Sequence, residues 1–532
     1  MKTKILLLLL TIPAIIALLK PGYFPMHDDI QGMRVYQMYK CVLDLQIPCR
    51  WVPDMGFGYG YPQFNFYSPL PYYLMEIPVL FGGSILASVK LGFLASLVLS
   101  AWSMYLLGSF LWGKKGGVIS ALFYTYAPYR AVDIYVRGAM GEAWAFVFLP
   151  LILLFTLKPK STIPLALSIA GLFLTHNITV IMFSPFYVTF VLFFRKNHGN
   201  DLKNILKSGI LGFALSAFFT LPAFLEKNYT HVESVLMGYF NYLAHFVGVG
   251  QLFLSTHWGY GVSSLGELDG MSLSVGVLHW SIPLLVLILL FYLKKIEEFR
   301  KVLIFVILGF LALFLIHPRS QFIWDNVSLL SYIQFPWRFL GIAVFCFSLA
   351  SGALIKLTNR KLLMVITIFV ILILMNGSFF KPERYVYITD GEKFSGDSWL
   401  KQQTISILDY LPAGAQHPPT SPASNGPKFS GEVISGQKGT NWQTWELNVY
   451  DEDNKLELPL FYFPGWEVKV DGEPVKIDSA NELGLITVDV PSGQHLVEAR
   501  LKDTNLRLIA NLVSLIGLGA LVLYRKIKWL SH

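Results

Sequence analysis

Charged side chains are scarce in this sequence. Only 14% of its 532 residues are Asp, Glu, Lys or Arg, against about 25% in a typical soluble domain. Hydrophobic residues make up 54%, so much of the surface is expected to face lipid. The net charge of +8 does not indicate a nucleic-acid-binding protein, because the Lys and Arg residues stand in short groups between apolar runs, as membrane topology requires.

Cysteine is also scarce, with only Cys41, Cys49 and Cys346 present. Three cysteines exclude a disulfide framework and a four-cysteine metal site, although Cys41 and Cys49 can pair outside the cytoplasm. Paired His/Cys metal spacings and the Gly-x-Ser-x-Gly nucleophile elbow are missing. The glycines of 56–60 lack the strand–turn–helix context and the Gly-Lys-Ser/Thr of a phosphate loop.

Long apolar runs dominate what is there. A bilayer core needs roughly 17–25 apolar residues per helix, and twelve runs are expected to cross it. The first run follows a basic start and lacks a small-residue cleavage site, so we interpret it as an uncleaved helix. The expected spans are 4–20, 84–110, 116–128, 144–157, 162–175, 177–194, 205–222, 277–293, 302–316, 335–355, 362–378 and 508–524.

Basic residues predict the orientation of these spans. They fall on one side of the membrane, which the positive-inside rule makes cytoplasmic together with both termini. The protein is therefore expected to be a multi-pass protein of the plasma membrane. The basic groups are Lys2 and Lys4, Lys114-Lys115, Lys158 and Lys160, Arg195-Lys196, Lys294-Lys295, Arg300-Lys301, Lys356, Arg360-Lys361, and Arg525-Lys526 with Lys528.

The other, extracytoplasmic side receives the long segments, where a site can be built. These segments are 21–83, 129–143, 223–276, 317–334 and 379–507. The expected domains are a transmembrane domain over 1–378 whose external loop 21–83 carries interfacial helices, a β-rich extracytoplasmic domain over 379–507, and a final span with a basic tail over 508–532.

Segment 379–507 changes character after a loop rich in Pro, Ser and Gly. Strand-like runs follow, separated by tight-turn signals at Asp471-Gly472 and Ser492-Gly493. We predict a small β-sandwich there, and an α-helical polytopic membrane protein of about 12 transmembrane helices as the fold class. The runs are Trp442–Tyr450, Leu456–Phe463, Trp466–Val470, Leu485–Val490 and His495–Leu501.

Two adjacent carboxylates, Asp28 and Asp29, follow the first span at the expected start of an interfacial helix over 30–44. A helix N-terminus favours carboxylates. Such a pair can act as a general base or hold a divalent cation. The alternative is a plain helix cap. Arg34 lies in the same external loop and is a candidate phosphate ligand.

A second polar cluster lies between two external span ends. Asp133 and Arg137 form an i,i+4 pair, which by itself can simply be a salt-bridged helix. Arg130, Arg137 and Glu142 near a membrane are costly unless partnered, which favours a functional role.

Further polar residues stand at external span ends: Lys90 inside the second span, His176 between the fifth and sixth spans, and Arg338 at the top of the tenth. Each can be an interfacial anchor. Their shared side suggests one cavity in which Arg groups bind phosphate and carboxylates deprotonate a hydroxyl.

These residues carry a resemblance. The chain resembles the bacterial and archaeal membrane proteins known as 6-pyruvoyl-tetrahydropterin-synthase-related, over most of its length. The matching stretches are His27-Asp28-Asp29, Arg50-Trp51-x-Pro53, Gly58-Tyr59-Gly60-Tyr61-Pro62, Phe66-Tyr67-Ser68-Pro69-Leu70-Pro71, Asp133-x-Tyr135-x-Arg137-Gly138 with Glu142, Thr175-His176-Asn177, Phe335-Pro336-Trp337-Arg338-Phe339, Phe463-Pro464-Gly465-Trp466 and Val470-Asp471-Gly472.

That family is similar in layout to the GT-C glycosyltransferases, which use polyprenyl-phosphate or polyprenyl-diphosphate sugars. The resemblance implies interfacial helices at about 30–44 and 69–82, and places Asp28 at the leading position of an acidic pair, with Asp29 where the pattern has Glu. It implies sugar transfer from a polyprenyl-phosphate donor to a glycan, lipid or protein acceptor in cell-envelope assembly.

Within that scheme Asp28, Asp29 and Glu142 are the catalytic candidates. The candidates for phosphate binding are Arg34, Lys90, Arg130, Arg137, His176 and Arg338. The sequence establishes no cofactor, and a divalent cation on Asp28 and Asp29 is one alternative. A lipid-linked-sugar transporter or flippase, and a non-catalytic protein of envelope glycan assembly, are the competing hypotheses.

Overall fold

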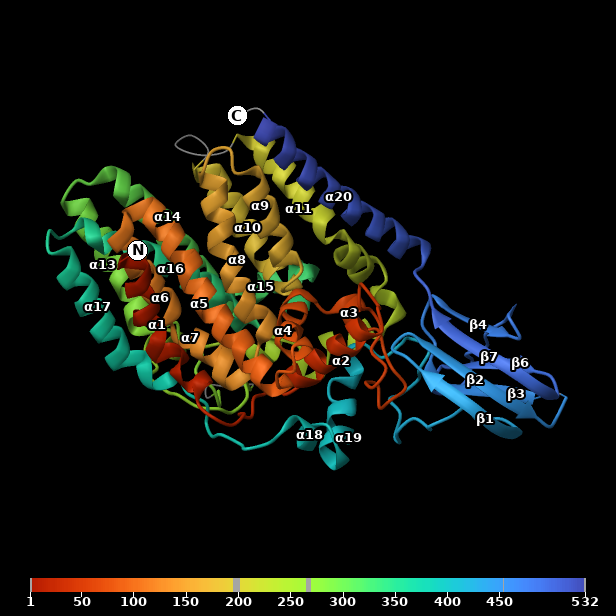
Figure 1. The fold of residues 1–532 in the computed structure, drawn as a ribbon. Coiled ribbons are helices and arrows are strands. Elements are labelled where there is room, and N and C mark those ends of the chain that lie inside the picture. Colours follow the sequence, from red (N-terminus) through yellow and green to blue (C-terminus); the bar gives the residue numbers. More distant parts are fainter. Residues whose placement is uncertain (1, 195–200, 265–268, 453, 531–532) are drawn as a thin grey trace. The chain divides into compact units, whose positions relative to one another are not determined.

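The computed structural model describes residues 2–194, 201–264, 269–452 and 454–530 (Figure 1). Its contacts divide the chain into two compact units. The first unit comprises 1–31, 87–213 and 236–387, and the second comprises 32–86, 214–235 and 388–532. Each unit therefore combines segments that are far apart in the sequence. The boundaries of the units differ from the expected domain boundary at residue 378. Of the basic groups that predict the orientation, Arg195-Lys196 lie outside the described residues.

The first unit is a bundle of helices. α16 (Leu340–Gly352) packs against α14 (Ile296–Ile316), α13 (Val277–Tyr292) and α6 (Lys114–Thr125). Close approach is possible because small residues meet: a Cβ on Gly352 would lie 2.2 Å from the Ser120 hydroxyl oxygen. The other helices longer than ten residues are α1 (Lys2–Leu19), α5 (Ile85–Trp112), α8 (Met140–Leu157), α9 (Thr162–Phe173), α10 (Asn177–Phe194) and α17 (Lys361–Asn376).

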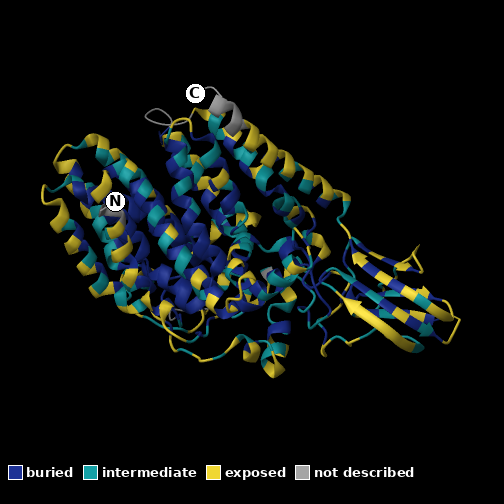
Figure 2. Ribbon diagram, in the orientation of Figure 1, coloured by how far each residue is buried: buried dark blue, intermediate teal, exposed yellow. Residues whose placement is uncertain are grey.

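Burial separates central from peripheral helices in this unit (Figure 2). In the span Pro336–Lys356, 94% of the residues are buried, against 22% in the span Lys361–Phe379. Most of the exposed side chains of α17 are apolar, among them Leu363, Ile366 and Leu374. Contiguous exposed apolar surface of this kind belongs in contact with lipid.

All twelve expected spans coincide with helices, but their lengths differ. Among the described residues, eight helices are long and apolar enough to cross a membrane, and Ile5–Leu19, Thr162–Phe173 and Val277–Tyr292 are shorter apolar helices. The twelfth, α6, has only 12 residues and is buried from Gly116 to Thr125. The chain is built as a multi-helix membrane protein.

The second unit joins segment 32–86 to the C-terminal region. α2 (Gln31–Leu43) and α4 (Leu70–Leu80) confirm the two helices expected at 30–44 and 69–82. A disulfide bond joins Cys41 to Cys49. The unit's other helices are α3 (Gln63–Phe66), α18 (Asp390–Lys393), α19 (Gly396–Thr404), α20 (Asn505–Leu530) and the second half of α11 (Leu202–Leu225), which begins in the first unit.

The β region confirms the expected strands and adds two. A five-stranded antiparallel sheet has the order β1-β2-β7-β4-β5, and β3 pairs with β6. Side chains from both sheets share one apolar core, including Leu447, Leu458 and Val497. The strands are β1 (Gly431–Lys438), β2 (Trp442–Val449), β3 (Asn454–Phe461), β4 (Trp466–Val470), β5 (Glu473–Val475), β6 (Leu485–Val490) and β7 (Gly493–Leu501).

The two strands not expected are both short of apolar residues. Seven of the eight residues of β1 are exposed, so its sequence lacks the alternation that marks a half-buried strand. β5 has three residues and follows the Asp471-Gly472 turn, whose φ angles of 52° and 86° are those of a tight hairpin.

A buried ion network fastens α20 within the second unit. The Glu226 carboxylate accepts hydrogen bonds from Arg507 Nε (2.9 Å) and Asn65 Nδ2 (2.8 Å). Arg50 Nε pairs with Asp503 at 3.1 Å. Glu226 is 2% and Arg507 0% exposed, so each charge depends on its partner.

Replacing Glu226 by Gln should destabilise the second unit by about 3–5 kcal/mol, because the buried Arg507 would lose its counter-charge. Glu467→Gln is the matched control: it removes a pair with Lys502 whose side chains are both half-exposed, worth about 0–1 kcal/mol. Unfolding of the full chain in detergent measures both. Equal losses would show that the buried pair has no special weight.

Candidate functional site

The candidate site of the first unit is organised around a π-helix, Val132–Arg137, which follows the single turn of α7 (Pro128–Ala131). Gly138 ends it with a φ of 70°. π-helical turns are rare and often occur at functional sites. A Cβ on Gly138 would lie 2.3 Å from the Met26 sulfur, so this glycine lets the loop between α1 and α2 approach.

The acidic loop is hydrogen-bonded to that turn. Asp28 N donates to Arg137 O at 2.8 Å and His27 N to Val136 O at 3.0 Å. Gln31 Nε2 donates to Gly138 O at 2.8 Å. The two polar clusters that the sequence places about a hundred residues apart are therefore held together by backbone.

Arg137 is the centre of a buried ion cluster. Its Nη1 donates to Asp133 Oδ1 (2.5 Å), Glu142 Oε2 (2.8 Å) and the Tyr129 hydroxyl (3.2 Å). Tyr129 in turn donates to Glu142 Oε1 at 2.6 Å, and the guanidinium lies 4.5 Å from the centre of the Trp337 ring. The predicted Asp133–Arg137 pair is confirmed, and Glu142 joins it.

The electrostatics of this cluster are unbalanced, with two carboxylates against one guanidinium. Burial and then the charge of Glu142 raise the pKa of Asp133 well above its ordinary value. Burial opposes the charge of Arg137, but Glu142, Tyr129 and Asp133 outweigh it and raise the pKa of that guanidinium. Arg137 therefore stays charged, and Asp133 is the carboxyl that favours its protonated form.

Asp28 and Asp29 have different surroundings. Asp28 is exposed and Asp29 is half-buried. The charge of Asp28 acts on both Arg137 and Arg338. Burial and then the charge of Asp29 raise the pKa of Tyr23. Asp28 is thus a solvent-exposed carboxylate whose charge acts on two guanidinium groups.

Arg338 is the second of these guanidinium groups. It belongs to the 3-10 turn η8 (Pro336–Phe339) that precedes α16. Its Nη1 donates to Ile333 O (2.6 Å) and Gln334 Oε1 (3.2 Å), and no carboxylate in the described part of the chain pairs with it. Its buried Nε has no hydrogen-bond partner among the described residues.

His176 stands where the sequence indicates a break, between α9 and α10. Its Nδ1 lies 2.7 Å from the Thr179 hydroxyl. Burial lowers its pKa to about 3; Glu142 counteracts this, and Arg338 and Arg137 add to it. The imidazole is therefore neutral near neutral pH, so His176 can offer phosphate a hydrogen bond but not a positive charge.

This lowered pKa predicts a pH-dependent stability. An unfolded chain protonates the imidazole below about pH 6.5, whereas the folded chain resists protonation down to about pH 3. The unfolded state then binds more protons, so stability falls as the pH is lowered through this window. His176→Gln should flatten the fall of the melting temperature between pH 6.5 and 4. Parallel curves of melting temperature against pH for the wild type and His176→Gln would contradict the prediction. The lowered pKa of His245 acts equally in both proteins.

Two other predicted phosphate ligands of the first unit are engaged in structural contacts. Arg130 is fully buried and donates to the Ser100 hydroxyl (2.8 Å), while its guanidinium lies 4.0 Å from the centre of the Phe146 ring. Lys90 Nζ donates to Lys20 O (2.5 Å) and Gly22 O (2.7 Å), at the end of α1. These contacts do not bring either side chain to Asp28.

Arg34 belongs to the second unit, on α2. Its guanidinium lies 3.7 Å from the centre of the Tyr67 ring, and the hydroxyls of Tyr61, Tyr72 and Tyr410 also act on its charge. Arg34 is 4% exposed, so its contacts are those of a cation enclosed by tyrosines.

Sequence patterns did not reveal the aromatic and hydroxyl groups that support the site. Trp337 Nε1 donates to the Ser263 hydroxyl at 3.1 Å, which also meets His245 Nδ1 at 2.9 Å. Ser263 and His245 lie 18 residues apart in an irregular segment, at no spacing that indicates a site. Tyr129 precedes Arg130 in the sequence, but no pattern predicts its hydrogen bonds to Arg137 and Glu142.

The divalent cation suggested for Asp28 and Asp29 finds few ligands. Among the described residues, no three His, Cys, Asp or Glu side chains are grouped so as to hold a metal ion. Calcium takes six to eight oxygen ligands and magnesium about six, so a cation on Asp28 and Asp29 would take most of its ligands from water or substrate, and it stays a prediction.

The chain is distantly similar to known proteins. The sequence matches no family model. It is 27% identical over 239 residues to an uncharacterized protein of Lactococcus lactis subsp. cremoris (strain MG1363), covering 41% of this chain and 38% of that one. The crystal structure of an Archaeoglobus fulgidus oligosaccharyltransferase with a tethered acceptor peptide aligns with a TM-score of 0.47 and 14% identity, over 80% of this chain and 60% of that one. The chain thus spans less than two thirds of the length of either protein.

Proposed function

We propose that this protein is a membrane glycosyltransferase of the GT-C type, belonging to the 6-pyruvoyl-tetrahydropterin-synthase-related family. It moves a sugar from a polyprenyl-phosphate donor to an acceptor hydroxyl on the extracytoplasmic face. The observation that carries the proposal is the placement of Asp28. Its side chain is exposed, its backbone N–H donates to Arg137 O, and its charge acts on Arg137 and Arg338.

The proposed reaction needs a base and a stabilised leaving group. Asp28 accepts the proton of the acceptor hydroxyl as its oxygen bonds to the anomeric carbon. The bond from that carbon to the phosphate oxygen breaks, and the polyprenyl phosphate leaves with the electron pair. Arg338 stabilises the departing phosphate, a contribution of about 3–4 kcal/mol for one well-placed donor.

The roles of the remaining candidate residues are assigned from their contacts and burial. The charge of Arg137 is already matched by Asp133 and Glu142, so Arg137 holds the loop of Asp28 and contributes less to binding phosphate. Glu142 is 3% exposed and is a positioning residue for Arg137. Asp29 and His176 border the site, His176 as a neutral hydrogen-bonding group. Lys90, Arg130 and Arg34 keep their structural contacts.

The proposed reaction takes place at the membrane. A polyprenyl donor enters laterally from the bilayer, its phosphate at the outer interface beside Asp28. Both termini lie in the cytoplasm of a plasma-membrane protein. The acceptor is a glycan, lipid or protein of the cell envelope.

Reconstitution of the full chain in liposomes with a radiolabelled polyprenyl-phosphate sugar tests the proposal. Transfer of label to an added glycan, lipid or peptide acceptor supports it. Label that crosses the bilayer without transfer identifies a flippase instead, a possibility raised by charged residues near membrane spans. Donor binding with neither transfer nor movement identifies a non-catalytic assembly protein.

A further inference from the structure

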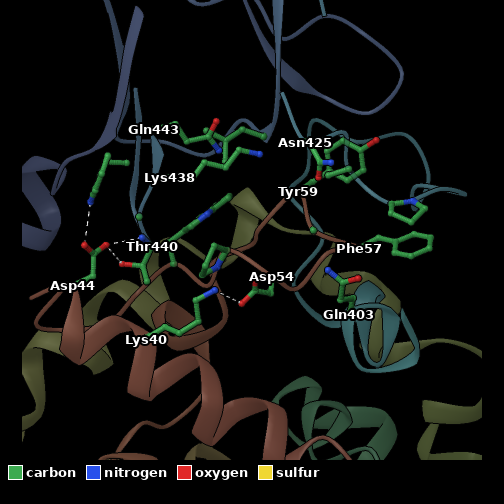
Figure 3. Close-up of a pocket in the computed structure, with 18 of the residues that line it drawn as sticks. Lys40, Asp44, Asp54, Phe57, Tyr59, Gln403, Asn425, Lys438, Thr440 and Gln443 are labelled. Carbon is green, nitrogen blue, oxygen red and sulfur yellow. Dashed lines mark hydrogen bonds and ion pairs between the residues drawn. The ribbon is translucent and has the colours of Figure 1, made fainter. Parts of the chain in front are cut away.

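A second site lies wholly in the second unit, in a cleft with a volume of about 510 Å³ (Figure 3). Small-molecule sites occupy about 300–1,000 Å³. The cleft is lined by α2, the loop 51–59, α19, the segment 422–425, the turn between β1 and β2, and one residue each of β3 and β4. Segments from several parts of the sequence thus converge on one hollow.

Aromatic rings line this cleft from three different segments. Phe57 comes from the loop, Trp399 from α19 and Trp442 from the start of β2, and all three are half-buried. Trp442 is held in place, because its Nε1 donates to Asp44 Oδ1 at 3.1 Å. Partly exposed, oriented rings offer flat apolar faces with a polar edge, which suit the C–H faces of sugar rings.

Three amides stand among the polar side chains of the cleft. Gln403, Asn425 and Gln443 line the cleft (Figure 3). An amide carries both donors and an acceptor, and so does a sugar hydroxyl. A lining of amides therefore matches a ligand whose polar groups both give and accept hydrogen bonds.

The charges in the cleft cancel. Lys40 Nζ pairs with Asp54 Oδ2 at 2.7 Å. Asp44 Oδ2 accepts from Thr440 N (2.5 Å) and the Thr440 hydroxyl (2.7 Å). Lys438 is the other lysine. Two lysines against two aspartates give no excess of positive charge to attract a phosphate or another anion.

We propose that this cleft binds an uncharged oligosaccharide. Aromatic faces, amides and balanced charge together fit a neutral glycan better than an anionic headgroup or an apolar peptide. That the bound glycan is the acceptor of the transfer reaction rests on the proposed function; glycan binding itself does not.

Binding of maltohexaose and of the hexamer of N-acetylglucosamine to the full chain in nanodiscs, followed by saturation-transfer NMR, tests the proposal. At least one of them should bind. Trp399→Ala should weaken that binding about tenfold, the effect of losing one stacking partner. Asn425→Ala changes an exposed loop residue, cannot unfold the protein, and should weaken binding by a smaller factor.

Tyr450→Ala is the matched control, since Tyr450 is an exposed aromatic residue of the same β region that does not line the cleft. Binding should be unchanged in it. The proposal fails if neither hexasaccharide binds, if both cleft variants bind as wild type, or if inorganic pyrophosphate competes for the same site. The wild type and Asp28→Asn together separate the two proposals. Glycan binding in both proteins, with sugar transfer in neither, leaves the cleft assigned and removes the glycosyltransferase.

Discussion

Asp28→Asn is expected to lower sugar transfer about 10²–10⁴-fold, the usual contribution of a general base. The substitution keeps the shape of the side chain and removes its ability to take a proton. Because Asp28 is exposed and its fixed contact is made by backbone N–H, folding should be unaffected. The measurement is initial-rate transfer from a labelled polyprenyl-phosphate sugar, with the melting temperature recorded beside it.

Asp325→Asn supplies the control for this loss. Asp325 is an exposed carboxylate of α15 (Gln321–Asn326) that accepts a hydrogen bond from Tyr242. Its replacement should leave transfer near the wild-type rate. Asp29→Asn distinguishes the members of the acidic pair: a loss confined to Asp29→Asn would move the base to the half-buried carboxylate. Full activity in Asp28→Asn would refute the assignment.

Arg137→Met is expected to destabilise the protein by about 3–5 kcal/mol, because it leaves Asp133 and Glu142 buried without their cation. Both carboxylates are at most 3% exposed, so water cannot replace the guanidinium. The melting temperature of the full chain in detergent should fall accordingly. Arg319→Met, an exposed arginine in the same unit, should change it little.

A double substitution tests the physical reason for that loss. If the cost comes from unpaired buried charge, adding Glu142→Gln to Arg137→Met should restore part of the stability, since one carboxylate then needs no partner. Additive losses in the double variant would show instead that packing around Trp337 and Tyr129 dominates.

The candidate site shows how sequence and structure divide the information. The acidic pair and the Arg137 cluster were recognisable because charge is rare in a chain of this composition, and rare charge near a membrane needs a reason. The pattern did not distinguish Arg338, whose guanidinium has no carboxylate partner among the described residues, from Arg130, which donates to Ser100 and Ala143. Both are single arginines at a span end.

Contacts between residues far apart in the sequence could not be predicted from local patterns. Lys90 meets backbone carbonyls 68 and 70 residues away, and Arg507 meets Glu226 at a separation of 281 residues. The cleft of the second unit draws on several separate segments for the same reason. Such meetings depend on how the elements pack, and the charge of a side chain does not specify its partner.

The sequence by itself determined the local structure: twelve helices where apolar runs lie, five strands where apolar residues alternate, the two helices expected at 30–44 and 69–82, and the break at His176. Local patterns suffice there because backbone hydrogen bonds in helices, and burial of one face in strands, depend on neighbouring residues. Tertiary structure alone decided that Asp28 is held at Arg137 and that Arg34 is enclosed by tyrosines. Those contacts follow from packing between distant segments, where the cost of burying a charge selects its partner.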